Sequence, residues 1–149
     1  MADVIFNKGK ADILNGSINM EVTATTSVER LQVVLLSTSY APNATETNCA
    51  NWVASEVGHA NYKSAANRKC LESKYIGTHI AAGTVALTAT STVYTTSVNG
   101  EAFRWVGIAK YASQDSLALP IVCLDVTSQS CSGGAITIAW HANGILNFV

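Results

Sequence analysis

The hydrophobic residues of the chain follow two different spacings, and the first occurs at the amino end. Over residues 4–14 the apolar side chains recur at intervals close to those of one helical face. Asp3 stands where an N-cap residue is preferred, and Gly16 stands where helices commonly end. The pattern therefore predicts a short opening helix.

The second spacing begins at residue 18. Over 18–24 apolar and polar residues alternate strictly, which is typical of a strand with one buried face. The apolar run within 28–36 is too continuous for a one-sided strand and predicts a strand that is buried on both faces. Residues 39–43, which include a proline, then break the chain.

A helical spacing returns after this break. Trp52 and Val53 follow Cys49 at steps of three and four. Glu56 follows them at steps of four and three, all behind an N-cap at Thr47 or Asn48. We therefore expect a second short helix over 47–57, followed by a loop over 58–62.

The remainder of the chain predicts strands joined by turns. Weak signals cover 68–75, 84–90 and 92–97, and clearer ones cover 103–110, 121–126, 136–140 and 145–148. Asn99-Gly100 lies between two of these segments and predicts a hairpin, because both residues tolerate positive φ. Residues 128–134, rich in serine and glycine, predict another turn.

Seven or eight short strands with two short helices predict an all-β fold, an antiparallel β-sandwich or a flattened barrel. A chain of 149 residues is long enough for one domain, and no linker or internal repeat divides it. We therefore expect one domain over 1–149, with residues 1–16 as a candidate interaction arm.

Composition narrows the function classes. Apolar residues make up 48% of the chain and charged residues 13%, and the formal net charge is −1, so disorder is not expected. Such a chain lacks the basic surface that binds nucleic acid or an anionic membrane, and we expect neither partner. The amino end does not resemble a signal peptide, which predicts synthesis in a cytoplasm.

The chain contains four cysteines, Cys49, Cys70, Cys123 and Cys131. A cytoplasmic origin favours reduced thiols. Oxidation after release from a cell is the alternative, in which Cys123 and Cys131 would face each other across a hairpin.

Residues that often bind metals or perform catalysis occur without their usual partners. Cys49, His59, Cys70 and His79 are spaced too widely for the paired ligands of a structural zinc site. The acids Glu72, Glu101, Asp115 and Asp125 form no recognisable pair and are interpreted as solvated surface groups. His141 is interpreted as an outward polar residue on a strand. We predict no catalytic, cofactor-binding or metal-binding residue and no enzyme activity.

Motifs near both ends of the chain form a further sequence feature. The first half contains Asn7-Lys8-Gly9-Lys10, Ile13-Leu14-Asn15-Gly16, Val34-Leu35-Leu36, Ser39-Tyr40-Ala41-Pro42 and Glu56-Val57. The second contains residues 104–111, Pro120-Ile121 with Asp125, residues 134–140 and 143–146. As a set, these motifs resemble a family of small proteins encoded among the structural genes of tailed bacteriophages. The resemblance is strongest over 1–16 and from residue 104 onward, and weak over 63–97.

This resemblance implies a virion structural protein. The expected role is a capsid decoration (cement) protein on the capsid exterior, which binds the major capsid protein shell and often forms a homotrimer. A tail or baseplate component is the second interpretation. A carbohydrate-binding module that uses Trp52, Trp105 and Trp140 is the third, although tryptophan on an alternating strand usually fills a core.

Two segments are candidates for contacts with the capsid or with sister subunits. Residues 2–14 and 40–48 place apolar side chains near a terminus and in a loop, where they need a partner to cover them. The alternative is that the amino-terminal helix packs on its own domain. The predicted contact residues are Val4, Ile5, Phe6, Tyr40, Pro42 and Asn43.

Overall fold

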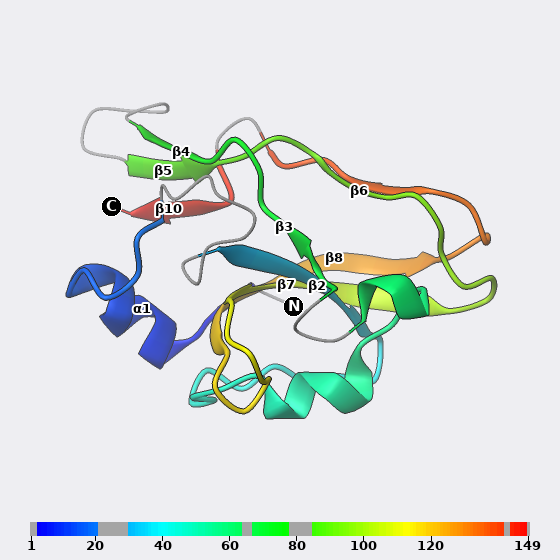
Figure 1. Ribbon diagram of the computed structural model, residues 1–149, viewed down its shortest axis with the longest axis horizontal. Coiled ribbons are helices and arrows are strands. Elements are labelled where there is room, and N and C mark those ends of the chain that lie inside the picture. Colours follow the sequence, from blue (N-terminus) through cyan, green and yellow to red (C-terminus); the bar gives the residue numbers. More distant parts are fainter. Residues whose placement is uncertain (1–2, 21–29, 64–66, 78–84, 142–143, 149) are drawn as a thin grey trace.

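The computed structural model describes residues 3–20, 30–63, 67–77, 85–141 and 144–148. Its strands form a five-stranded, a three-stranded and a two-stranded antiparallel sheet (Figure 1). One α-helix and two short 3₁₀ helices occur in the described residues. The prediction of an all-β, sandwich-like fold is confirmed, and the sheets do not close into a barrel.

The five-stranded sheet has the order β1-β8-β7-β2-β3. Its strands are β1 (Val4–Ile5), β2 (Leu31–Ser37), β3 (Lys69–Cys70), β7 (Ala102–Lys110) and β8 (Leu119–Ser130). Every residue of β2 except the last is buried, because β7 and β3 flank the strand and side chains cover both of its faces. The prediction of a strand buried on both faces is thus confirmed.

The other two sheets lie over one face of the five-stranded sheet (Figure 1). The three-stranded sheet contains β4 (Tyr75–Gly77), β5 (Val85–Thr88) and β10 (Leu146–Phe148), and the two-stranded sheet contains β6 (Thr92–Tyr94) and β9 (Ile136–Ile138). The larger hydrophobic core includes Leu35, Leu87, Tyr94, Phe103 and Ile108. A second core contains Phe6, Tyr40, Trp52 and Trp105, so each face of the central strands is covered.

The opening helix begins later than its pattern predicts. Val4 and Ile5 form β1, which pairs with Val122 and Cys123 of β8, and helix α1 covers only Asn7–Leu14. The carboxylate of Asp3 is not an N-cap, because it accepts a hydrogen bond from the backbone N–H of Asp125. Val4 and Ile5 are therefore held by strand pairing and not by a longer helix, with Val4 half-buried and Ile5 exposed.

The second predicted helix is shorter and wound more tightly. Residues 47–57 contain only the 3₁₀ helix η1 (Ala50–Ser55), and the expected loop contains a second 3₁₀ helix, η2 (Ala60–Tyr62). The side chain of His59 accepts a hydrogen bond from the backbone N–H of Asn61, which stabilises the start of η2.

Several predicted strand boundaries are wrong. The segment 68–75 is divided between β3 and β4, which belong to different sheets. In 18–24, Ile18 and Met20 are buried and Asn19 is exposed, as alternation predicts, but residues 18–20 form no strand, and 21–29 lie outside the described residues.

Two predicted turns also need correction. Asn99-Gly100 does form a turn, with φ of +83° at Gly100, but it joins β6 and β7, which lie in different sheets. The second turn begins later than predicted because β8 continues through Ser130. Strand β8 therefore contains Cys123 and ends at Ser130, directly before Cys131. The two cysteines do not face each other across a hairpin.

Candidate partner-binding surface

The two segments predicted to contact a partner lie next to each other. The backbone N–H of Asn7, at the start of α1, donates a hydrogen bond to the carbonyl of Ala44 (2.9 Å). The N–H of Phe6 donates to the carbonyl of Ile121 in β8 (3.0 Å). Residues far apart in the sequence thus form one continuous region beside the start of β8.

Two of the predicted contact residues point into the protein. Phe6 is fully buried and Tyr40 is 8% exposed, and both rings lie against Trp52, with centroid distances of 5.9 and 6.4 Å. The Tyr40 hydroxyl donates a hydrogen bond to Glu46 (2.8 Å), and burial together with this carboxylate raises the pKa of Tyr40. These two side chains therefore pack within their own domain and do not face a partner.

The remaining predicted residues and two further leucines are accessible. Ile5 is 45% exposed, Asn43 is exposed, and Val4 and Pro42 are half-buried. Leu14 at the end of α1 and Leu117 in the loop 111–118 are the most exposed large hydrophobic side chains described, at 69% and 67%. We call Ile5, Leu14, Pro42, Asn43 and Leu117 the α1 face.

A shallow groove lies between α1 and the loop 111–118. Its volume is about 310 Å³, and Lys8, Asp12, Tyr111 and Leu117 line it. Lys8 and Asp12 form an ion pair along the helix (2.6 Å), so their charges largely cancel. Lys110 also lines the groove, so this part of the surface combines apolar contacts with a small positive charge.

A buried ion-pair network holds the loop 111–118 against the domain. Arg68 is 4% exposed and donates two hydrogen bonds to Glu56, each 2.8 Å long, and another to Asp115. Burial alone would lower the pKa of Arg68, but its hydrogen bonds to these carboxylates and their negative charges outweigh burial and raise it. The backbone N–H of Cys49 donates to the carbonyls of Asp115 and Ala118 (3.0 Å each). Leu117 is thus presented by an anchored loop.

The interpretation of the acidic residues as solvated groups is wrong for three of the four. Asp115 binds Arg68, and Glu101 forms an ion pair with Lys63 (3.9 Å). Asp125 accepts two hydrogen bonds from Arg104 (3.1 and 2.8 Å), which hold the pKa of Asp125 at about 2. Glu72 is exposed, as predicted. Each paired acid joins segments that are far apart in the sequence.

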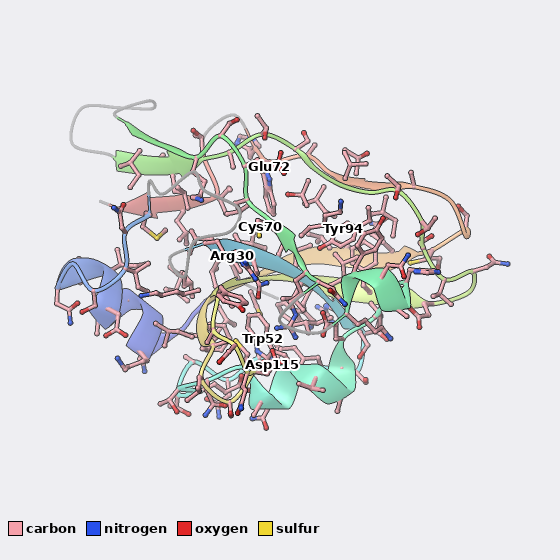
Figure 2. All side chains as sticks on the ribbon, in the orientation of Figure 1. Arg30, Trp52, Cys70, Glu72, Tyr94 and Asp115 are labelled. Atoms are coloured by element: carbon pink, nitrogen blue, oxygen red, sulfur yellow. The ribbon has the colours of Figure 1, made fainter. Side chains whose placement is uncertain are left out.

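The tryptophans largely serve the core. Trp52 and Trp105 are 0% and 1% exposed, which confirms the core interpretation for both (Figure 2 labels Trp52). Trp140 is half-buried and packs against the larger core. The predicted outward position of His141 is confirmed, although it follows β9 and does not lie on a strand.

The four cysteines are all free thiols in the structure. Burial raises the pKa of both Cys49 and Cys123, which lie in the same core. Of the four candidate zinc ligands, His79 lies outside the described residues. Within the described part of the chain, no group of three or more potential ligands could hold a metal ion.

Sequence reasoning missed Leu117 and Arg68. A signal for Leu117 was present, since it is a large apolar residue in a segment of turn-forming polar residues. Arg68 offered no local signal, because its partners Glu56 and Asp115 lie 12 and 47 residues away.

Comparison with known proteins identifies no family. No protein-family model matches the chain, and neither the curated proteins nor the solved structures contain a significant match. In the described residues, no helix has the length and apolar character needed to cross a membrane.

Proposed function

We propose that this protein is a virion structural protein of a tailed bacteriophage. In this proposal it is a capsid decoration (cement) protein without enzyme activity. It binds the outside of the major capsid protein shell as a homo-oligomer, with a trimer favoured. The proposal rests first on the motifs that resemble the phage family.

The observation that carries the proposal is a contact between the two ends of that resemblance. A Cβ atom on Gly9 would lie 2.6 Å from the carbonyl oxygen of Pro120 and 2.8 Å from the Cα of Ile121. Only glycine therefore lets α1 lie this close to β8. Gly9 belongs to the amino-terminal motif, and Pro120-Ile121 belongs to the carboxyl-terminal set. Two motifs that lie far apart in the sequence, and that each resemble the family, thus contact each other in the fold.

Further motif residues meet in the same part of the fold. The indole N–H of Trp105 donates a hydrogen bond to the carbonyl of Tyr40 (2.9 Å). Val57 donates its backbone N–H to the carbonyl of Leu35 (3.0 Å). The segment 63–97, which resembles the family least, contributes β3 to the five-stranded sheet and β4, β5 and β6 to the other two sheets, to which the motif segments 134–140 and 143–146 also contribute through β9 and β10.

The α1 face suits the proposed role. It combines exposed apolar side chains with few unpaired charges, which favours contact with another protein. On a symmetric shell, many weak contacts of this kind add up to strong overall attachment. We therefore assign the contact with the shell to this face.

The copy number of the protein in purified virions tests the proposal. Quantitative mass spectrometry against the major capsid protein should give on the order of hundreds of copies per particle, because a shell repeats its binding site. About six or twelve copies would indicate a tail component instead. Either that result or absence from the particle would overturn the capsid assignment.

Point variants test the assigned face better than a truncation does. Deleting residues 2–14 would remove Phe6 from the core and unfold part of the domain. Leu117→Lys places a charge on an exposed side chain and should lower the copy number on virions at least about tenfold. Val93→Lys is the matched control, since Val93 is 42% exposed on β6. Equal copy numbers for both variants would contradict the assignment.

A further inference from the structure

Cys70 borders a groove at the place where β3 meets β6. The groove has a volume of about 250 Å³, and its lining includes Lys69 and Cys70 of β3 together with Thr92 and Val93 of β6. Cys70 is half-buried, whereas the other three cysteines are buried. Cys70 is therefore the cysteine that a small molecule in solution reaches most readily.

The charges around the Cys70 thiol are mostly positive. Burial raises the pKa of Cys70, while the nearby charges of Arg30, Lys74 and Lys69 act against this rise. Glu72 supplies the opposing negative charge, and Figure 2 shows Cys70 between Arg30 and Glu72. Three cations against one carboxylate leave a positive field at the sulfur, which attracts small anions.

One of these cations is buried without a counter-ion. Lys74 is 5% exposed, and its ammonium donates one weak hydrogen bond, to the carbonyl of Leu71 (3.3 Å). Among the described residues, no carboxylate forms an ion pair with it, and burial lowers the pKa of Lys74. A negative charge brought next to Cys70 would offset part of the cost of burying this ammonium.

The groove also offers hydrogen-bond donors. The ammonium of Lys69 lies 5.1 Å from the centroid of the Tyr62 ring, which holds it at the groove. Thr92 is 5% exposed, and its hydroxyl has no hydrogen-bond partner in the described part of the chain. A buried hydroxyl without an acceptor costs free energy. The lining therefore lacks an acceptor that a carboxylate would supply.

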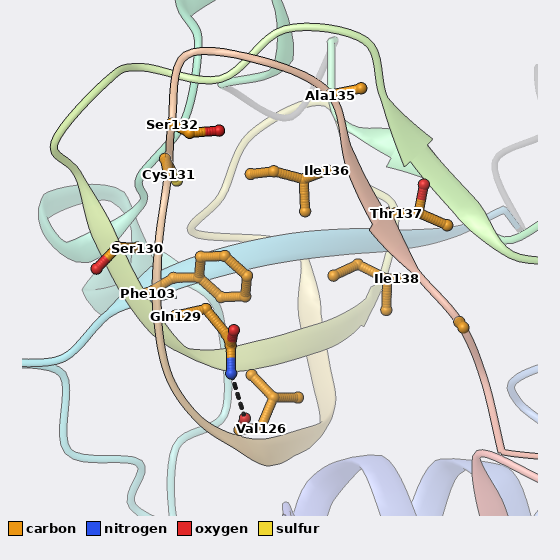
Figure 3. A pocket seen from close by; sticks show the side chains of 11 residues that line it. Phe103, Val126, Gln129, Ser130, Cys131, Ser132, Ala135, Ile136, Thr137 and Ile138 are labelled. Carbon is orange, nitrogen blue, oxygen red and sulfur yellow. Dashed lines mark hydrogen bonds between the residues drawn. The ribbon is translucent and has the colours of Figure 1, made fainter.

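Cys131 provides a contrast within the same chain. It is 4% exposed and borders a groove of about 360 Å³ between β8 and β9 (Figure 3). None of the residues that line that groove carries a formal charge. Burial and the carboxylate of Glu101 raise the pKa of Cys131. Of these two thiols, Cys70 is the one whose surroundings attract an anion.

We propose that Cys70 is a site of reversible thiol–disulfide exchange with small anionic disulfides. The Cys70 thiol loses its proton, and its sulfur attacks one sulfur of the disulfide. A bond forms between these two sulfurs, the original S–S bond breaks, and the second sulfur leaves as a thiolate that takes up the proton. The three cations attract the carboxylates of the disulfide, and Lys69 and Thr92 donate hydrogen bonds to the half that stays bound. This site does not depend on the proposed capsid function.

Two disulfides of opposite charge test the proposal on the purified, reduced protein. Oxidised glutathione has a net negative charge, and cystamine has a net positive charge. Mass spectrometry should find the first glutathione adduct on Cys70. The ratio of the two rate constants, glutathione over cystamine, is divided by the same ratio for the neutral thiol β-mercaptoethanol. This corrected ratio should be at least about three at low salt and should fall as salt is added.

Three outcomes would overturn the proposal. They are the absence of a glutathione adduct, a first adduct on another cysteine, and a corrected ratio near or below one. Cys70→Ser should lose the early adduct with both reagents.

Charge variants test the source of the selectivity. Lys69→Gln should lower the corrected ratio at least about threefold, whereas Lys10→Gln removes the same charge from an exposed position on α1 and should not change it. Glu72→Gln should raise the ratio. Glu72 is exposed, so this variant should fold even if Lys69→Gln does not, and thermal unfolding verifies each fold. An unchanged ratio in Glu72→Gln and in folded Lys69→Gln would overturn the proposed attraction.

Thr92→Val tests the hydrogen bond to the bound half. The substitution keeps the shape of the side chain and removes the hydroxyl, so the reduced protein should be at least as stable in thermal unfolding. Half-modification of Cys70 should then require an about fivefold higher ratio of oxidised to reduced glutathione. An unchanged ratio would contradict the assigned role of Thr92.

Discussion

Trp52 packs directly on the backbone of Gly107. A Cβ atom on Gly107 would lie 2.6 Å from Cζ3 of the Trp52 ring. Gly107 lies in the middle of β7, and Trp52 belongs to η1, so this contact sets how closely η1 approaches the central sheet. The same ring contacts Phe6 and Tyr40, which anchor the two segments that border the α1 face.

Gly107→Ala should therefore destabilise the protein. The added methyl group overlaps a ring held by neighbours on several sides, and such overpacking typically costs about 1–3 kcal/mol in unfolding free energy. Urea denaturation measures this loss. Gly134→Ala is the control, because the nearest atom to its Cβ is the Ser132 Oγ at 3.9 Å. Equal stability of Gly107→Ala and the unaltered protein would show that Trp52 can move away.

The substitution Arg68→Met should lower the free energy of unfolding more than Gly107→Ala does. It leaves the buried carboxylate of Glu56 without its cationic partner, which typically costs about 3–5 kcal/mol. The double variant Arg68→Met with Glu56→Leu removes both charges of this pair and should recover part of that loss, as denaturation would show, while Asp115 still lacks its partner. A double variant that loses the sum of the two single effects would contradict a direct pairing.

The pKa of Asp125 predicts a specific response to acid. Hydrogen bonds from Arg104 lower that pKa to about 2, below the value of about 3.9 expected in an unfolded chain. The pair therefore stabilises the fold fully above about pH 4, and this contribution is lost as the pH falls through about 2. NMR titration should show this midpoint, and Arg104→Gln should raise it toward about 3.9. A midpoint near 4 in the unaltered protein would contradict the pairing.

The cysteines should differ in reactivity. Cys70 is half-buried, while Cys49, Cys123 and Cys131 are buried. Labelling of the native protein with a thiol reagent should therefore modify Cys70 first, and Cys70→Ser should lose this early phase. All four thiols should react after unfolding without reductant. Fewer than four reactive thiols would instead support oxidation.

The sequence predicted the strands whose burial is visible in the local order of apolar and polar residues. β2 is largely apolar because both faces are buried, and β7 (Ala102–Lys110) contains the recognisable segment 103–110. The short strand β1 was missed because Val4 and Ile5 become a strand only by pairing with residues more than a hundred positions away. The Asn99-Gly100 turn was found, but its local chemistry does not specify which sheets it joins.

The candidate surface was also predictable only in part, because a local pattern does not show which residues cover a side chain. Ile5, Pro42 and Asn43 are accessible as expected, whereas Phe6 and Tyr40 bind Trp52 in the interior. Apolar character near a terminus indicates that a side chain needs cover, but it does not indicate whether the cover comes from the same domain.

Lysine cross-linking in purified virions tests the assigned docking face most directly. Lys10 is exposed on α1, beside the α1 face, whereas Lys63 lies near the start of β7 and pairs with Glu101. Mass spectrometry after treatment with a short lysine-reactive cross-linker should find Lys10 joined to the major capsid protein more often than Lys63. Cross-links from Lys63 but not from Lys10, or links only to tail proteins, would contradict docking through the α1 face.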